Sequence, residues 1–295
     1  MKLSITICLL LLCSVLSAQN YVDLVRLDYD YGLPRSFEDD SDKQASVKEI
    51  TADITIPIVL SKSLNLITGL NSEWINTTLY SSSTSQSLKS IMLKLGVNIK
   101  HSSKLSGTYI LLPKISSDQL KIGKNNLQLG GLMLWKYSIS ESSAYKFGMY
   151  CNSDLFGPMI VPIFGFYKQK GKLETNLTLP LSADINYRIK SNTRIGLKFT
   201  GINKSYHLHK SPDQYVVKIN NEIGPYIQVA FGRLNLSLQT GTTVLRSYRT
   251  YQVGDQVNYA ISLYRPGDTR QQLNTDFKDG LFIKTSLIYR FSINS

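Results

Sequence analysis

Residues 281–291 read Leu-Phe-Ile-Lys-Thr-Ser-Leu-Ile-Tyr-Arg-Phe, and this stretch decides the fold class. Its odd positions are apolar apart from Thr285, whereas its even positions include Lys284, Ser286 and Arg290. A period of two places successive side chains on opposite faces of a β-strand. The stretch therefore predicts a strand with one apolar face and one charged face, close to the end of the sequence.

The N-terminal residues follow the pattern of a secretory signal peptide. Lys2 supplies a positive start, the residues from Leu3 to Leu16 are mostly apolar, and Ser17-Ala18 offers small residues for cleavage. We therefore expect residues 1–18 to be removed. Residues 19–295 should then form a single domain.

Cysteine content and charge narrow the class further. Cys8 and Cys13 leave with the signal, so Cys151 has no partner for an intramolecular disulfide and a disulfide-stapled fold is excluded. The formal charge falls from +12 to +11, because Lys2 is the only charged residue of the signal. An exported protein rarely meets nucleic acid, so we expect membrane lipid and small anionic solutes as partners, and no nucleic acid.

After the signal, no apolar run approaches the roughly 20 residues that a membrane helix needs. The longest run, residues 158–167, contains Pro158, Pro162 and Gly165. A chain of this kind can span a membrane only as a closed barrel, because open strands leave backbone groups without hydrogen-bond partners in lipid.

The alternation of residues 281–291 recurs along the chain. Residues 21–31, with Tyr21 on the apolar face, and residues 50–58 and 91–99 repeat it clearly. Residues 173–189 predict either one very long strand or two strands bent at Pro180. Dividing 277 residues by about 23 per strand and connection predicts about 12 strands, with 10 to 14 left open.

The predicted connections alternate between tight turns and long loops. The long loops include residues 32–45, 76–87 and 201–213, and the longest is about 249–280. Membrane barrels have short periplasmic turns and long extracellular loops, whereas a sandwich has no reason to sort its connections. Aromatic residues near strand ends suit a belt at the lipid interface. The prediction is an all-β transmembrane antiparallel barrel.

Three segments resemble an outer-membrane β-barrel family of unknown function from Gram-negative bacteria: Ser17-Ala18-Gln19, residues 177–189 and Tyr289-Arg290-Phe291. The resemblance implies a location in the outer membrane. It also implies that the last strand, with Leu287, Tyr289 and Phe291, closes the barrel and is recognised by the barrel-assembly machinery. It supplies no catalytic or binding residues.

The polar strand faces carry more basic than acidic residues. In a barrel these faces line the lumen, and a lining rich in basic charge favours anions. The alternative is that the charges pair across a filled interior that conducts nothing. The predicted basic lining consists of Lys94, Lys100, Lys136, Lys146, Arg188, Lys198, Lys218, Lys284 and Arg290.

Two histidine-containing segments could carry chemistry. His207 and His209 would share one face of a strand, but no acidic or cysteine ligand is near them in sequence, so an exposed loop edge is the preferred interpretation. His101 and Ser102 lack a recognisable orienting group and oxyanion site, as a serine hydrolase requires. We predict no catalytic residue, no metal site and no cofactor.

The hypothesis is a non-enzymatic outer-membrane barrel that passes or binds small solutes with a mild anion preference. One alternative is a structural or adhesive barrel that binds a partner through its long loops. Another is a soluble, secreted β-sandwich with a binding role.

Overall fold

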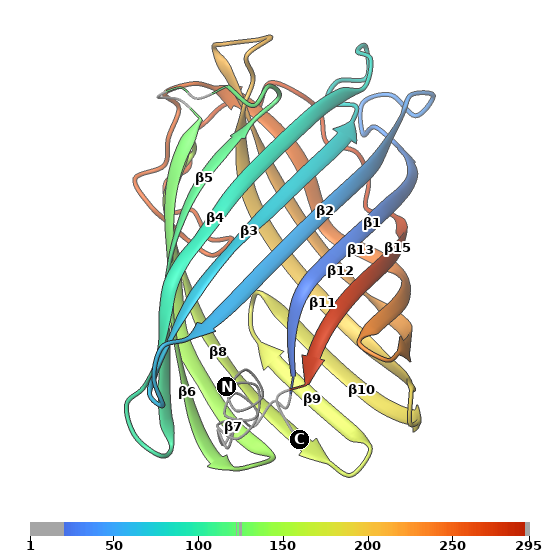
Figure 1. The fold of residues 1–295 in the computed structure, drawn as a ribbon. Helices are drawn as coiled ribbons and strands as arrows, with labels where there is room; N and C mark the ends of the chain where they lie inside the picture. Colours follow the sequence, from blue (N-terminus) through green and yellow to red (C-terminus); the bar gives the residue numbers. More distant parts are fainter. Residues whose placement is uncertain (1–20, 122, 124–125, 293–295) are drawn as a thin grey trace, which may run out of the picture.

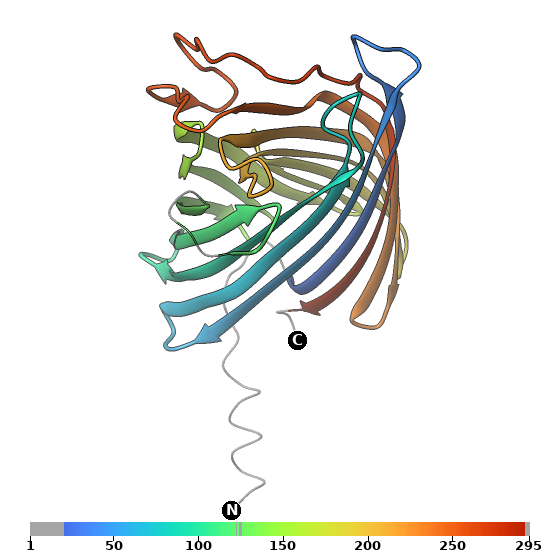
Figure 2. The ribbon, with the colours of Figure 1, turned by 90° about the horizontal axis from the view of Figure 1, so that it is seen from above.

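The computed structural model describes residues 21–121, 123 and 126–292, so the predicted signal peptide at residues 1–18 lies outside the described residues. The chain folds into one antiparallel β-sheet that curls into a barrel (Figures 1 and 2). No helix in the described part of the chain is long and apolar enough to cross a membrane. The strands are β1 (Tyr21–Ser36), β2 (Gln44–Val59), β3 (Leu64–Thr77), β4 (Gln86–Lys100), β5 (Leu105–Ser117), β6 (Leu127–Ser140), β7 (Ser143–Asp154), β8 (Gly157–Lys170), β9 (Leu173–Thr178), β10 (Ser182–Lys190), β11 (Thr193–His207), β12 (Gln214–Phe231), β13 (Leu234–Gln252), β14 (Ala260–Ile261) and β15 (Leu281–Ser292).

Each long strand pairs with its sequence neighbours, and the ring closes where β15 pairs with β1. Fourteen of the fifteen strands form the ring. The short β14 is not part of it, because it pairs only with the edge of β8, in parallel. The predicted barrel is confirmed, but twelve strands is wrong. All strands belong to one closed sheet, whereas a sandwich would have two.

The extra strands come from the segment that the sequence left ambiguous. Of the two predictions for residues 173–189, the two strands that meet at Pro180 are correct. The chain reverses completely at residues 179–181, so that β9 pairs with β10. β7 and β8 are also joined directly through residues 155–156. Such compact hairpins use fewer residues per strand than the average of about 23 per strand and connection from which twelve strands were predicted.

The two ends of the barrel differ in their connections. At the end that we call the turn end, strands are joined by short segments such as residues 141–142, 191–192 and 232–233. At the opposite end, the loop end, the connections include residues 78–85, 118–126 and 253–280. The predicted asymmetry holds except at the two compact hairpins, β7–β8 and β9–β10, which have tight connections at the loop-end side.

The hairpin of β9 and β10 is too short to complete the wall. β8 pairs with β9 only at residues 167–170, apart from one bridge between Phe164 and Leu179. β11 likewise loses its partner β10 beyond Thr200. The loop-end halves of β8 and β11 therefore do not pair with each other as neighbours in the ring.

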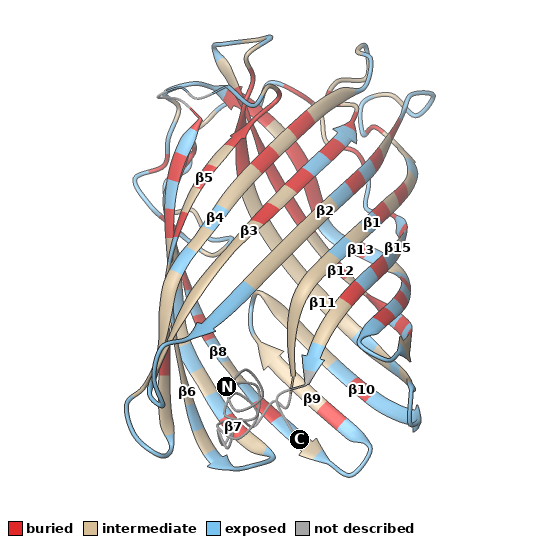
Figure 3. Ribbon diagram, viewed as in Figure 1, coloured by how far each residue is buried: buried red, intermediate tan, exposed pale blue. Residues whose placement is uncertain are grey.

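The loop-end half of β11 instead lies inside the barrel. His207 pairs with Ser117 of β5 on the far side of the gap. The Ser205 hydroxyl donates a hydrogen bond of 2.8 Å to Asp154 on the inner face of β7, and Val217 and Ile219 of β12 pack against Met159 and Val161 of β8. The wall is thus doubled at this end, and Figure 3 shows buried residues gathered there.

This inner layer explains two wrong loop predictions. Residues 201–207 continue β11 and residues 249–252 continue β13, although both were predicted to be loops. Their outer faces contact protein rather than lipid, so polar residues such as Asn203, Ser205 and His207 replace the apolar half of the alternation. The pattern that identifies a lipid-facing strand is lost where the strand turns inward.

Elsewhere the two faces of the sheet are sorted by polarity. On β15 the odd residues point outward, and Leu287 and Phe291 are each 43% exposed, whereas Phe282 and Ile288 are buried inside. Tyr21 is an exception to the predicted pattern. A register shift between Asp23 and Val25 turns it to the inner face, where its hydroxyl donates to Glu174.

Candidate functional site: the barrel interior

The predicted basic lining residues all lie on the polar, inward side of their strands, but they fall into two groups. Lys94, Lys218, Lys284 and Arg290 form ion pairs. The remaining five form no ion pair with any carboxylate in the described part of the chain. These five are Lys100, Lys136, Lys146, Arg188 and Lys198.

The loop-end half of the interior contains a buried charge network. The Lys218 ammonium, whose side chain is 0% exposed, lies 2.7 Å from Glu49 and 2.5 Å from Glu73. Glu73 also accepts hydrogen bonds from Lys204 at 2.7 Å and from the Tyr206 hydroxyl at 2.6 Å. Two carboxylates thus satisfy two ammonium groups, as buried charges require.

Further pairs extend this network along the interior. Lys284 contacts both Asp30 and Glu222, and Lys94 lies 2.6 Å from Asp53. Between the two layers of the wall, Lys114 lies 3.4 Å from Asp154, and both side chains are buried. The loop-end half is therefore filled by its own side chains, and its buried lysines are paired with carboxylates.

An apolar cluster seals the loop end above the network. Phe37 and Phe277 bridge the first and last long connections, and they pack with Ile75, Leu79 and Tyr248. Asn274 fixes the long connection to this cluster, because it accepts from the Thr250 backbone N–H and donates to the carbonyls of Leu79 and Tyr248, each at 2.8 Å.

The outer part of the same connection is held by arginine. The Arg270 guanidinium lies 4.2 Å from the ring centre of Tyr251 and pairs with Asp268 at 2.7 Å. Hydrogen bonds from Arg270 hold the pKa of Asp268 below its usual value. β14, in this connection, pairs with Met159 and Ile160 on the free edge of β8. Residues 253–280 therefore form a folded cap rather than a free loop.

The turn-end half of the interior holds a polar cavity of about 180 Å³. Its basic lining residues are Arg26, Lys198 and Arg290, and its acidic ones are Asp23 and Asp184. Arg290 pairs with Asp23 at 2.5 Å, and Arg26 pairs with nearby Asp28 at 2.8 Å. Lys198 forms no ion pair, although Asp184 lies opposite it on β10 and accepts hydrogen bonds from Tyr226 and Asn186. Lys198 is therefore the cavity's candidate cation for an anionic ligand.

Two more cations without carboxylate partners lie on this half of the wall. Lys136 and Lys146 are directly opposite each other on β6 and β7. The Lys146 ammonium donates to Asn176 at 2.5 Å and to Thr178 at 3.1 Å, which are neutral acceptors. Lys100 and Arg188 lie nearer to the strand ends at the turn end. All five predicted lining residues without an ion pair therefore lie in this half.

The histidine segments are placed differently from one another. His207 is buried at the end of β11, not at an exposed edge as predicted, and its ring centre lies 4.9 Å from that of His209. Asp118 is the acidic neighbour, with 3.4 Å between Asp118 Oδ1 and His209 Nδ1. No group of three or more His, Cys, Asp or Glu residues suited to a metal occurs among the described residues. His101 lies in the turn between β4 and β5 and contacts the Tyr109 hydroxyl at 3.0 Å.

Sequence reasoning missed Lys204 and Tyr206, because it treated their segment as a loop. It also missed the pair of Lys114 and Asp154, which links β5 and β7 of the outer ring where the inner layer covers them. A weak signal was available: Ile202 and Tyr206 would share one face of a strand, with Lys204 between them and Asn203, Ser205 and His207 on the other face. This pattern indicates a strand only when polar outer faces are allowed.

The fold and its interior define a class: a closed fourteen-stranded antiparallel barrel with an apolar outer face and a charged inner face. Residues 15–258 match a protein family described as "Domain of unknown function (DUF6268)", and the chain belongs to this family. The predicted resemblance to a family of unknown function is confirmed. No curated protein matches the sequence.

Three solved structures with a similar arrangement are remote from this chain in sequence. An outer membrane channel from Pseudomonas putida F1 is 10% identical, with a TM-score of 0.46, over 92% of this chain and 95% of that one. The Pseudomonas putida toluene transporter TodX is 8% identical, with a TM-score of 0.33, over 91% and 90%. The NanC porin is 9% identical, with a TM-score of 0.34, over 89% and 98%.

Proposed function

We propose that the protein is a non-enzymatic outer-membrane barrel that binds small anionic solutes in its interior and passes them across the membrane. The location is supported by the outward apolar residues, such as Leu287 and Phe291, which are 43% exposed and suited to lipid. It is also supported by the difference between the two barrel ends, since the turn end corresponds to the periplasmic side of such barrels.

A single observation carries the anion preference. Of the nine predicted lining residues, the five without a carboxylate partner all lie toward the turn end, whereas Lys94, Lys218 and Lys284, nearer the loop end, are paired. The buried Arg246 of the loop end lies over the Phe277 ring and donates to the Lys278 carbonyl instead. A lumen lined by uncompensated basic charge attracts anions and repels cations. The anionic ligand should therefore bind from the periplasmic side, at Lys198 and between Lys136 and Lys146.

Passage through the whole barrel needs a rearrangement. The network around Lys218 and the cluster around Phe277 fill the loop-end half. Solute binding at the turn end needs no such change. We therefore expect infrequent, small conductance events rather than a permanently open pore.

The proposal is tested with purified protein in planar bilayers under a salt gradient, where the reversal potential gives the ratio of chloride to potassium permeability. The variant Lys136→Gln/Lys146→Gln/Lys198→Gln should lower this ratio toward one. A control with the same change in net charge, Lys43→Gln/Lys62→Gln/Lys121→Gln, alters exposed lysines outside the lumen and should leave the ratio unchanged. Absence of both conductance and solute flux in the natural protein would contradict the proposal.

Adhesion through the long connection is the second candidate. Tyr259, Leu263 and Tyr264 are exposed on that segment, and exposed aromatic residues are common at binding surfaces. Replacing Tyr259 and Tyr264 by serine should abolish attachment to an external partner but leave bilayer conductance intact. The converse result would favour transport.

A further inference from the structure

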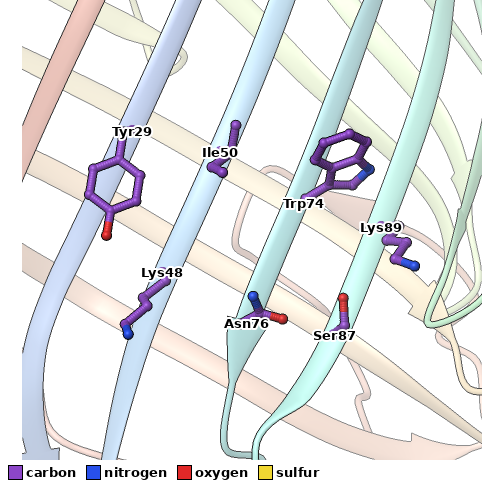
Figure 4. A pocket seen from close by; sticks show the side chains of 7 residues that line it. All are labelled: Tyr29, Lys48, Ile50, Trp74, Asn76, Ser87 and Lys89. Carbon is purple, nitrogen blue, oxygen red and sulfur yellow. The ribbon is translucent and has the colours of Figure 1, made fainter.

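The outer surface of the barrel carries a hollow of about 480 Å³ across β1, β2, β3 and β4 (Figure 4). It lies close to the loop end, because its β3 and β4 residues are within a few positions of the connection at residues 78–85. It is separate from the interior cavity, since all its side chains point outward. Its lining residues are Tyr29, Lys48, Ile50, Trp74, Asn76, Ser87 and Lys89.

Strand register arranges these residues in two rows. Ile50 is opposite Tyr29 on one side and Trp74 on the other, and Trp74 is opposite Lys89. The next row toward the loop end runs from Lys48 to Asn76 to Ser87. The first row is therefore apolar or aromatic from Tyr29 to Trp74 and ends at Lys89, and it borders a polar row; Figure 4 shows both rows crossing the strands.

The apolar row is strongly exposed: Tyr29 by 48%, Ile50 by 47% and Trp74 by 52%. Tryptophan and tyrosine favour the boundary between the acyl chains and the head groups of a membrane. The change from the first row to the second therefore marks the level of the lipid head groups on the loop-end side.

Lys48 and Lys89 stand at this level without acidic partners in the part of the chain that the structure describes. The Lys48 ammonium lies 5.9 Å from the ring centre of Tyr31. Lysines on a lipid-facing surface are costly in the apolar band but favourable beside anionic head groups. Their chemistry therefore fits phosphate, which lysine binds as a point charge.

We propose that this hollow binds a phosphorylated glycolipid of the outer leaflet. Strand spacing places the backbones of Lys48 and Lys89 roughly 12 Å apart, and a flexible side chain extends from each. Two phosphate groups on one sugar head group can therefore contact both lysines. Asn76 and Ser87, between them, can hydrogen-bond sugar hydroxyls, and an acyl chain can lie over Ile50 and Trp74.

A phospholipid with a single phosphate satisfies only one of the two lysines. The arrangement therefore distinguishes a head group with two separated phosphates from one with a single phosphate. This inference rests on the outer-membrane location proposed above. The location is tested separately, by fractionation and gel migration, so the two can fail independently.

The hollow contains a built-in reporter. Trp74 and Trp135 are the two tryptophans of the sequence, so Trp135→Phe leaves Trp74 as the sole fluorophore. The folded variant is placed in nanodiscs of phosphatidylcholine with brominated acyl chains, which quench nearby tryptophan. Bis-phosphorylated lipid A or phosphatidylglycerol, both without bromine, is then added to compete for the site and restore the fluorescence.

We expect lipid A to restore Trp74 fluorescence at a lower fraction of total lipid than phosphatidylglycerol does. Lys48→Gln and Lys89→Gln are each made in the Trp135→Phe background. Each should weaken the preference for lipid A over phosphatidylglycerol roughly fivefold, because one lysine near a charged membrane surface contributes about 1 kcal/mol. The control Lys62→Gln/Lys104→Gln alters exposed lysines at the turn end and should leave the preference for lipid A unchanged.

Two outcomes would overturn the inference. If lipid A and phosphatidylglycerol competed equally, the hollow would attract anionic lipids in general and would not select a head group with two phosphates. An unchanged preference in Lys48→Gln/Lys89→Gln, with folding verified by gel migration, would show that these lysines do not bind the head group.

Discussion

Lys218 shows at the residue scale why the loop-end half is closed. Its ammonium lies within 2.7 Å of two carboxylates, Glu49 and Glu73, and its side chain is fully buried. A buried ion pair is weak evidence for stability, but removal of one partner leaves uncompensated charge in the interior. The network therefore acts mainly as a constraint on which side chains can face each other across the lumen.

Lys218→Met should destabilise the barrel by about 3–5 kcal/mol, because Glu49 and Glu73 lose their shared cation. Urea unfolding in detergent, followed by tryptophan fluorescence, measures the change. The double variant Glu49→Gln/Lys218→Met removes one charge of each sign, leaves Glu73 paired with Lys204, and should recover part of the loss. A double variant less stable than Lys218→Met would contradict the account.

At the scale of the element, β12 and β13 approach closely where the inner layer begins. A side chain at Gly224 would place its Cβ 2.0 Å from the Thr240 carbonyl oxygen and 2.6 Å from Gly241. Gly224 lies opposite Lys198 of β11, at the lining of the turn-end cavity. The close approach therefore lies between the open and the filled halves of the interior.

Gly224→Ala should reduce the yield of folded barrel, because neither neighbouring group is a flexible side chain that can move aside. Its control is Gly131→Ala, where the nearest atom to the new Cβ, the Ile110 carbonyl oxygen, is 3.7 Å away. Refolding into detergent micelles, scored by the compact band on unboiled gels, measures both. Equal yields would show that the strands can separate to admit a side chain.

The long connection between β13 and β15 is a second element with a testable role. Asn274→Ala removes the hydrogen bonds to Thr250, Leu79 and Tyr248 that fix residues 253–280 across the barrel mouth. We expect faster protease cleavage within this connection while the barrel stays folded. The exposed Gln271, changed to alanine, serves as a comparison. Equal cleavage rates in the two variants would argue against the fixing role of Asn274.

The whole molecule determines how far sequence reasoning could reach. Alternation in stretches such as residues 281–291 predicted the barrel, because lipid outside and charge inside impose a period of two on each strand. The same rule failed at residues 201–207, where both faces of β11 contact protein. The nine basic lining residues could be predicted from strand phase, but their sorting into paired and unpaired groups depends on which strands face each other across the lumen.

The central claim is that these strands form a closed barrel in the outer membrane. The most direct test is to isolate the outer-membrane fraction and compare the migration of unboiled and boiled protein on a denaturing gel. The account predicts recovery in that fraction and a clear shift on boiling, because a closed sheet stays compact in detergent until heated. Recovery as a soluble protein, with the same migration before and after boiling, would contradict it.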